Sequence, residues 1–166
     1  MSRSEVAPGL YVGSKPLHGR HDVDVIVLAA EEYQPHATRF PDVEVIHVPL
    51  DDAPTRPMRE GEIKDALRAA DRVAQHLRAG RRVLVSCALG LNRSALIAAI
   101  AMHDVYGMAP DEIIRRLRQA RGPWALSNCR TQTSRSSYAS WPRDVKRTER
   151  SRAFQWPWQK PSQRSQ

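Results

Sequence analysis

The chain has 166 residues, a net charge of +8 with histidine neutral, and two cysteines. This length suffices for one domain with a hydrophobic core, and two cysteines exclude a disulfide-stabilised scaffold. The longest apolar stretch, Ala95–Met102, is too short to span a bilayer, and Met1–Pro8 lacks the apolar core of a secretory signal. We therefore expect a cytoplasmic protein with reduced thiols.

Positive charge is concentrated near the C-terminus. Residues 1–126 contain 17 Lys and Arg against 16 Asp and Glu, a balance of +1, whereas residues 127–166 contain 9 against 2, a balance of +7. We expect a folded catalytic domain over residues 1–130 and a basic, disordered tail over residues 131–166. The tail carries the aromatic cluster Phe154–Trp158, which makes it a candidate for contact with an anionic surface, either RNA or lipid.

Three segments in the first fifty residues have the composition of strands. Leu10–Val12 is expected to be the first. Asp24–Leu28 is apolar after its first residue, which is typical of a strand buried on both faces. Asp42–Val48 alternates between polar and apolar residues before Pro49, which favours a strand near an edge that ends there.

The middle of the chain predicts a helix followed by a strand. Apolar residues recur every three or four positions between Ile63 and Leu77, as in an amphipathic helix, and Gly80 is placed to terminate it. The apolar run Val83–Val85 predicts the next strand.

Two further helices are predicted after this strand. One runs from Ser94 to about Val105 and ends at Gly107, and the other begins at Pro110 and stops before Gly122. Strands that alternate with helices predict the α/β class, with a mostly parallel central sheet flanked by helices in a single domain.

The segment that joins the last strand to the following helix reads Cys87-Ala88-Leu89-Gly90-Leu91-Asn92-Arg93-Ser94. A loop that leaves a strand, turns through a glycine and begins a helix directs backbone N–H groups and partial positive charge at an anion. The same field lowers the pKa of a thiol, so Cys87 is a candidate nucleophile. Arg93 can bind two phosphate oxygens, and Ser94 can donate a hydrogen bond to the sulfur.

This loop resembles the signature loop of the dual-specificity protein phosphatases, a branch of the cysteine-dependent protein tyrosine phosphatase superfamily. Three other segments are similar to that family: the opening strand Pro8–Ser14, the acid-bearing strand and loop His47–Asp52, and the turn Arg121–Asn128. The resemblance covers about residues 6–130 and implies a protein tyrosine phosphatase-like fold.

The resemblance also implies hydrolysis of phosphomonoesters through a phosphocysteine intermediate, with no metal and no other cofactor. Cys87 would be the nucleophile, Arg93 and Ser94 would complete the catalytic set, and a nearby aspartate would be the general acid. Asp52 is the aspartate that aligns with the family's acid, and Asp51 is its alternative. The substrate-binding residues would be Ala88, Leu89, Gly90, Leu91, Asn92 and Arg93.

Ser86 departs from the family, which usually has histidine immediately before the cysteine. Serine carries no charge, so we expect the Cys87 thiol to be less acidic than in relatives that have the histidine.

The loop has no charged residue before Arg93, which favours a singly phosphorylated group, and the small domain predicts a shallow pocket. The leading interpretation is a dual-specificity protein phosphatase that acts on phosphotyrosine, phosphoserine and phosphothreonine, with a phosphorylated protein or peptide as its partner. Three alternatives stay open: a phosphatase of RNA 5′ ends or small metabolites, a phosphopeptide-binding pseudophosphatase, and a rhodanese-type sulfurtransferase. The sequence carries no signal for an oligomeric state.

Overall fold

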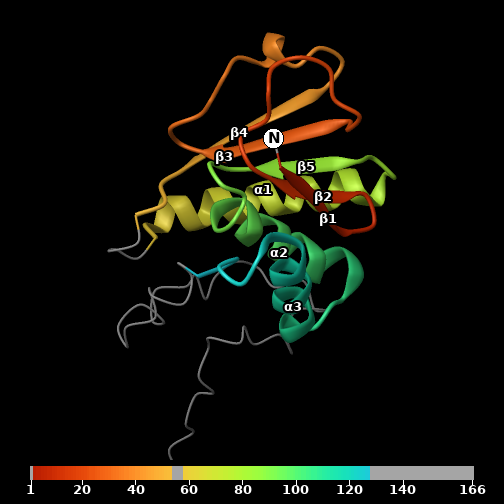
Figure 1. The fold of residues 1–166 in the computed structure, drawn as a ribbon, viewed down its shortest axis with the longest axis vertical. Helices are drawn as coiled ribbons and strands as arrows, with labels where there is room; N and C mark the ends of the chain where they lie inside the picture. Colours follow the sequence, from red (N-terminus) through yellow and green to blue (C-terminus); the bar gives the residue numbers. More distant parts are fainter. Residues whose placement is uncertain (1, 54–57, 128–166) are drawn as a thin grey trace, which may run out of the picture.

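The structure is a computed structural model, and it describes residues 2–53 and 58–127. Its sheet has five strands in the order β1–β2–β5–β3–β4, and all neighbours run parallel except β1, which is antiparallel to β2 (Figure 1). The strands are β1 (Arg3–Ala7), β2 (Leu10–Gly13), β3 (Val25–Ala30), β4 (Glu44–Leu50) and β5 (Val83–Ser86). The predicted α/β class with a mostly parallel sheet is confirmed.

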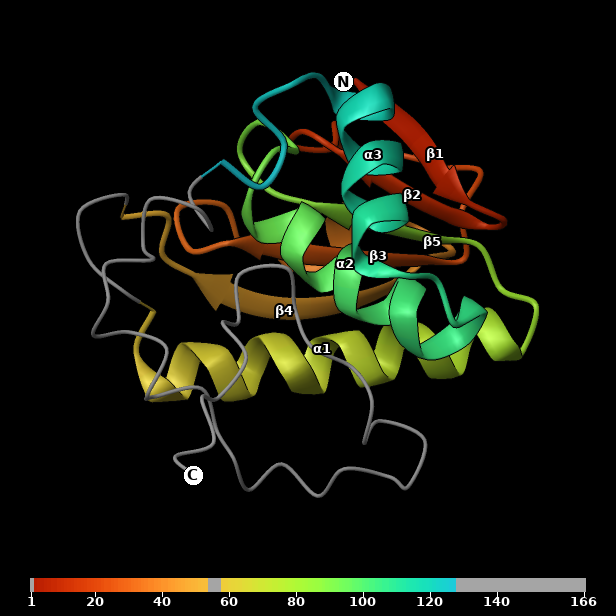
Figure 2. The same cartoon turned by 90° about the horizontal axis from the view of Figure 1, so that it is seen from below.

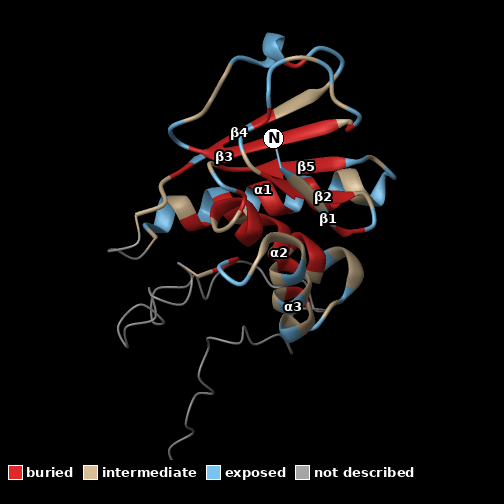
Figure 3. Ribbon diagram, viewed as in Figure 1, coloured by how far each residue is buried: buried red, intermediate tan, exposed pale blue. Residues whose placement is uncertain are grey.

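Three helices cover one face of the sheet, and the long connections before β3 and β4 cover the other (Figures 1 and 2). The helices are α1 (Glu60–Arg78), α2 (Arg93–Tyr106) and α3 (Pro110–Arg121). Most of α2 is buried, because it lies between the sheet and the other two helices (Figure 3). None of the helices in the described ranges has the length and apolar character needed to cross a membrane.

The continuous apolar run of β3 serves a separate core on each face of the sheet. Val25 and Val27 belong to the larger cluster under the helices, whereas Ile26 and Leu28 pack with Phe40 on the opposite face. A strand covered on both sides needs apolar residues at every position, which explains why β3 shows no alternation.

Two details of the sheet differ from the sequence prediction. β4 does not end before Pro49 but continues to Leu50. Proline has no backbone N–H to donate, and β4 tolerates it because an edge strand has no neighbouring strand on one side. The strand Arg3–Ala7 was not predicted, because its first three residues are polar. A short η1 turn (Ala37–Arg39) was also not predicted.

The parallel strands bring four segments of the chain to one edge of the sheet. β2, β3, β4 and β5 end at Gly13, Ala30, Leu50 and Ser86, so the residues that follow each strand meet there. Open α/β sheets bind ligands at this edge. The predicted tail at residues 131–166 lies outside the described residues.

The glycine that caps the C-terminus of α2 can be tested against a second glycine inside α1. Gly107 caps α2 with a φ of 63°, and Gly61 lies in the first turn of α1; a Cβ at either position would meet nothing within 4 Å. Gly107→Ala should therefore lower the free energy of unfolding by about 1–2 kcal/mol through backbone strain alone. Gly61→Ala is the matched control and should raise it by up to about 1 kcal/mol. Urea titration measures both, and equal effects would contradict the assignment of the Gly107 cap.

Candidate active site

Loop 87–93 connects the end of β5 to the start of α2, and its first residue is hydrogen-bonded to the end of β2. The backbone N–H of Cys87 donates to the carbonyl of Gly13 at 3.2 Å. Gly90 has a φ of 73°, a conformation that favours glycine, and this lets the chain reverse toward α2. The loop therefore curls over the first turn of a buried helix, as predicted from the sequence.

The sulfur of Cys87 lies inside this curl, and the residue is only 3% exposed. Its Sγ atom is 3.2 Å from the Oγ of Ser94 and accepts a hydrogen bond from the N–H of Gly90, also at 3.2 Å. Burial by itself raises the pKa of the Cys87 thiol, but hydrogen bonds from Ser94, Gly90 and Leu91 outweigh it and leave the pKa below its usual value. The thiol is therefore biased toward the thiolate, the form that acts as a nucleophile.

Ser86 makes no such contribution to the sulfur. Its side chain is buried, and its Oγ donates to the carbonyl of Val27 on β3 at 3.1 Å. The residue that stands where the family usually has histidine thus ties β5 to its neighbour, and the hydrogen bonds that lower the thiol pKa come from the other end of the loop.

Arg93, the first residue of α2, is 6% exposed, and its side chain is hydrogen-bonded to residues from two other segments of the chain. Its Nη1 and Nη2 atoms donate to the two carboxylate oxygens of Glu32 at 2.6 and 2.8 Å, and Nη1 also donates to the carbonyl of Leu50 at 2.9 Å. The Arg93 hydrogen bonds hold the pKa of Glu32 at about 2. Burial opposes the charge of Arg93, but the bonds to Glu32 and the nearby negative charges keep its pKa above the usual value.

The Nε atom of Arg93 has no hydrogen-bond partner, although it is buried; no other side-chain nitrogen or oxygen in the described ranges shares this condition. A buried donor without a partner costs about 1–3 kcal/mol, which an incoming acceptor would recover. This Nε, which makes no hydrogen bond, and the Cys87 sulfur belong to the two ends of one loop that curls on itself, so an oxyanion is the ligand that suits both.

Asp52 follows β4 and lies on the Arg93 side of the site. Its Oδ2 atom is 3.7 Å from Arg93 Nε, and its side chain is half-buried. Asp51 is also half-buried. Residues 54–57, shortly after Asp52, lie outside the described residues.

The remaining loop residues differ in exposure. Leu89 is 67% exposed and Gly90 is buried, while Ala88, Leu91 and Asn92 are half-buried. The carbonyl of Leu91 accepts from the N–H of Leu126 at 2.9 Å.

Comparison with known proteins shows the family of the chain and its fold. Residues 10–136 match the family described as dual specificity phosphatase, catalytic domain. The chain belongs to this family. A probable dual specificity protein phosphatase from Dictyostelium discoideum is 27% identical over 124 residues, covering 65% of this chain and 29% of that protein, so the chain spans less than a third of that relative.

Solved structures share the fold of this dual specificity phosphatase domain. The G95A mutant of Tk-PTP is 20% identical with a TM-score of 0.62, and it covers 79% of this chain and 91% of its own. Human DUSP28 is 21% identical with a TM-score of 0.60, and the match covers 80% of this chain and 93% of that one. The OH1 phosphatase from the Orf virus is 17% identical with a TM-score of 0.55, covering 80% of this chain and 84% of that one.

Two residues in contact with the loop of this phosphatase domain were missed by the sequence analysis. Glu32 follows β3, and the alignment of parallel strand ends could have indicated it. Arg121 donates to the carbonyls of Leu89 and Gly90, but a single arginine in an arginine-rich chain gives no signal of that contact.

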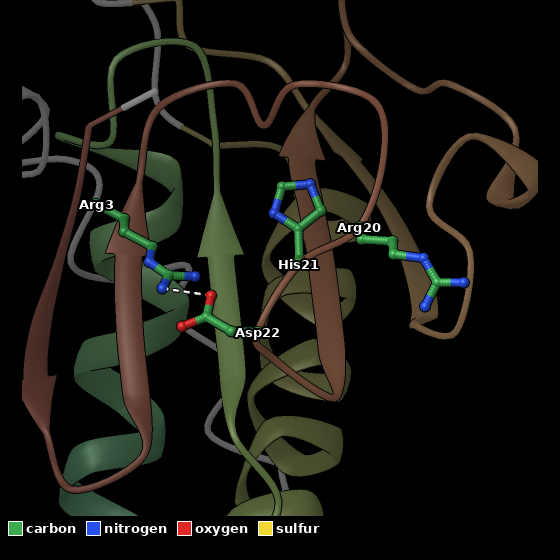
Figure 4. Close-up of a pocket in the computed structure, with 4 residues that line it drawn as sticks. All are labelled: Arg3, Arg20, His21 and Asp22. Carbon is green, nitrogen blue, oxygen red and sulfur yellow. Dashed lines mark ion pairs between the residues drawn. The ribbon is translucent and has the colours of Figure 1, made fainter.

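The domain also has a surface hollow of about 530 Å³ on the face of the sheet away from the helices (Figure 4). It is lined by Arg3, Arg20, His21 and Asp22. Arg3 is paired with Asp22, and neither Cys87 nor Arg93 lines the hollow. The hollow is therefore separate from the candidate active site.

The source of the thiol's acidity can be tested at two serines. Ser94→Ala removes the hydroxyl that contacts Sγ, so the pKa of Cys87 should rise. Ser86→Ala is the matched control, because its hydroxyl donates to Val27, and it should leave the thiol pKa unchanged. The measurement is the rate of Cys87 alkylation by iodoacetamide as a function of pH. Equal midpoints for Ser94→Ala and the parent would contradict this assignment.

The Glu32–Arg93 ion pair should appear in the pH dependence of stability. The pKa of Glu32 is about 2 in the folded protein against an ordinary value of 4.5, so its contribution is complete above pH 4.5 and is lost as the pH falls toward 2. Glu32→Gln should be destabilised relative to the parent at pH 6, and the difference should shrink by pH 3. Urea titrations at each pH measure this, with the exposed neighbour Glu31→Gln as control. A pH-independent difference would contradict the ion pair.

Proposed function

We propose that this domain hydrolyses phosphomonoesters by a two-step mechanism through a phosphocysteine. The observation that carries the proposal is the buried Nε of Arg93, which makes no hydrogen bond and lies 3.7 Å from Asp52 Oδ2, on the loop that also holds a thiol of lowered pKa. A tetrahedral oxyanion would accept a hydrogen bond from this Nε and meet the nucleophile in one position. Membership of the phosphatase family supports the same reaction class.

In the first step the Cys87 thiolate attacks phosphorus, an S–P bond forms, and the bond from phosphorus to the ester oxygen breaks. The departing oxygen takes a proton from the carboxylic acid of Asp52. Loop N–H groups and Arg93 stabilise the charge on the three equatorial oxygens during this inversion. Because Glu32 and Leu50 hold the Nη atoms of Arg93, the guanidinium is oriented before the substrate arrives.

In the second step water attacks the phosphorus of phosphocysteine, and the Asp52 carboxylate accepts its proton. The S–P bond breaks, which releases inorganic phosphate and restores the thiolate. The hydrogen bond from Ser94 stabilises sulfur as the leaving group, since it favours the anion over the neutral thiol.

The proposed substrates are phosphotyrosine, phosphoserine and phosphothreonine in proteins or peptides. Leu89 in the loop is 67% exposed, and Trp124, shortly after α3, is 71% exposed. Arg121 donates to the Leu89 carbonyl and the N–H of Leu126 donates to the Leu91 carbonyl, so the segment that carries Trp124 adjoins the loop that carries Leu89. Apolar surface beside a phosphate site suits a peptide or an aromatic ring better than a free sugar phosphate.

A substrate panel tests this function directly. Nitrophenyl phosphate, phosphotyrosine and phosphoserine peptides, and 5′-triphosphate RNA are compared at equal enzyme concentration. Turnover of both peptide classes supports the proposal. Turnover of RNA alone would replace the substrate class, and binding of phosphopeptide without turnover would identify a pseudophosphatase.

The catalytic roles can be separated by three substitutions. Cys87→Ser should abolish turnover, because the hydroxyl is a poor nucleophile at neutral pH. Asp52→Asn should lower kcat by about a hundredfold on a phosphoserine peptide, and by less on nitrophenyl phosphate, whose leaving group needs little protonation. Asp51→Asn is the matched control and should stay close to the parent. A larger loss in Asp51→Asn than in Asp52→Asn would reassign the acid, and full activity of Cys87→Ser would refute the covalent mechanism.

A further inference from the structure

The backbone of loop 87–93 has carbonyl groups that need partners outside the loop. When the N–H group of a peptide unit points inward, its carbonyl points outward, and a half-buried carbonyl without a partner destabilises that geometry. Three successive carbonyls are satisfied by the end of α3 and the turn after it. Arg121 donates from Nη2 to Leu89 at 2.9 Å and from Nε to Gly90 at 3.2 Å, and the N–H of Leu126 donates to Leu91 at 2.9 Å.

Figure 2 shows this turn beside the loop between β5 and α2. The third nitrogen of the Arg121 guanidinium, Nη1, also has a partner, because it donates to the Oγ of Ser2 at 2.9 Å. Ser2 in turn contacts Ser14, the residue after β2: the N–H of Ser2 donates to the Oγ of Ser14 at 3.1 Å, and the carbonyl of Ser2 accepts from the N–H of Ser14 at 2.9 Å. All three nitrogens of Arg121 thus have protein partners, which fixes the guanidinium plane against the outside of the loop.

Gly90 shows how tightly Arg121 closes on the loop. A Cβ at Gly90 would lie 2.6 Å from Arg121 Nη2 and 2.6 Å from the carbonyl carbon of Gly13. The Gly90 peptide is therefore enclosed between the backbone of β2 and the guanidinium of α3. The N–H of Gly90 donates to the Cys87 sulfur. The backbone of Gly13 and the guanidinium of Arg121 therefore fix in place a peptide group that contacts the nucleophile.

We infer that Arg121 is a positioning residue of the phosphate loop, which fixes the Leu89 and Gly90 carbonyls outward so that the loop N–H groups face the sulfur and the bound oxyanion. This rests on the proposed function, since it concerns the same loop. Two observations strengthen it. The Ser86 hydroxyl donates to Val27 and not to the sulfur. The conformation of the loop therefore depends on the hydrogen bonds to its outward carbonyls. Burial lowers the pKa of Arg121, while the nearby Cys87 charge acts in the opposite direction, so the two charges attract each other.

The test compares Arg121→Gln and Arg121→Lys with Arg115→Gln in the full chain. Arg115 is the matched control, because it lies on the same helix, is 73% exposed and pairs with Glu112. Three quantities are measured: the pH midpoint of Cys87 alkylation, resolved from Cys129 by peptide mass spectrometry; the dissociation constant of tungstate; and the melting temperature.

Arg121→Gln should raise the alkylation midpoint and weaken tungstate binding about tenfold or more, since loop donors lose their alignment. Arg121→Lys should recover part of both losses because it keeps the charge and can reach one carbonyl. Arg115→Gln should match the parent. Should Arg121→Gln fail to fold, Arg121→Lys decides the question: a raised midpoint at an unchanged melting temperature supports the inference, and a parental midpoint overturns it.

One further outcome would overturn the positioning role: a parental midpoint together with parental tungstate affinity in Arg121→Gln. If these parental values are accompanied by a loss of activity confined to multiply phosphorylated peptides, Arg121 is a substrate contact instead. Failure of the proposed function has a different signature: the parent itself would bind no tungstate, and its Cys87 would titrate as an ordinary thiol.

Discussion

The candidate site depends on the opposed directions of N–H and C=O in a peptide unit. Loop 87–93 can present N–H groups to a sulfur and an oxyanion only where its carbonyls find donors elsewhere. Those donors come from distant parts of the chain: the end of α3 and the turn that follows it. β2 supports the loop from the other side, because the carbonyl of Gly13 receives the N–H of Cys87. The order of the sheet, with β5 between β2 and β3, makes this arrangement possible.

The nitrogens of the Arg93 guanidinium also have two separate tasks: some orient the group, and one is available to bind an anion. Arg93 uses its Nη atoms on Glu32 and Leu50, both at the ends of neighbouring strands, and retains Nε. A guanidinium held in this way loses little freedom when an anion binds, so more of the interaction energy is available for the transition state. Asp52 lies 3.7 Å from the same Nε, so the end of β4 brings a carboxyl group to the site.

Much of the fold could be predicted from the sequence because the relevant signals are local. The apolar run at β3, the periodicity of α1 and the glycine after α2 each act within a few residues, and all three elements were predicted. β1 and the extension of β4 through Pro49 were not predicted. Their strand conformation depends on pairing partners and on edge position, which a local pattern does not contain.

The site could be predicted in part for the same reason. Cys87, Arg93 and Ser94 lie in one short segment, and their spacing, together with Gly90, the strand before the segment and the helix after it, indicated an anion loop. The structure places the Cys87 sulfur 3.2 Å from the Ser94 hydroxyl. Glu32 and Arg121 reach that loop only through tertiary contacts across 61 residues in one case and 31 in the other. Such contacts are set by the topology of the sheet and by the packing of α3, which a local sequence pattern does not contain.

The most direct measurement of the central claim is a crystal structure of the full chain with tungstate. The account predicts tungsten above the Cys87 sulfur, with loop N–H groups and Arg93 Nε on its oxygens and Glu32 still on the Nη atoms. An empty loop with the thiol turned into the core, and tungstate bound only in the hollow beside Arg3 and Arg20, would contradict it.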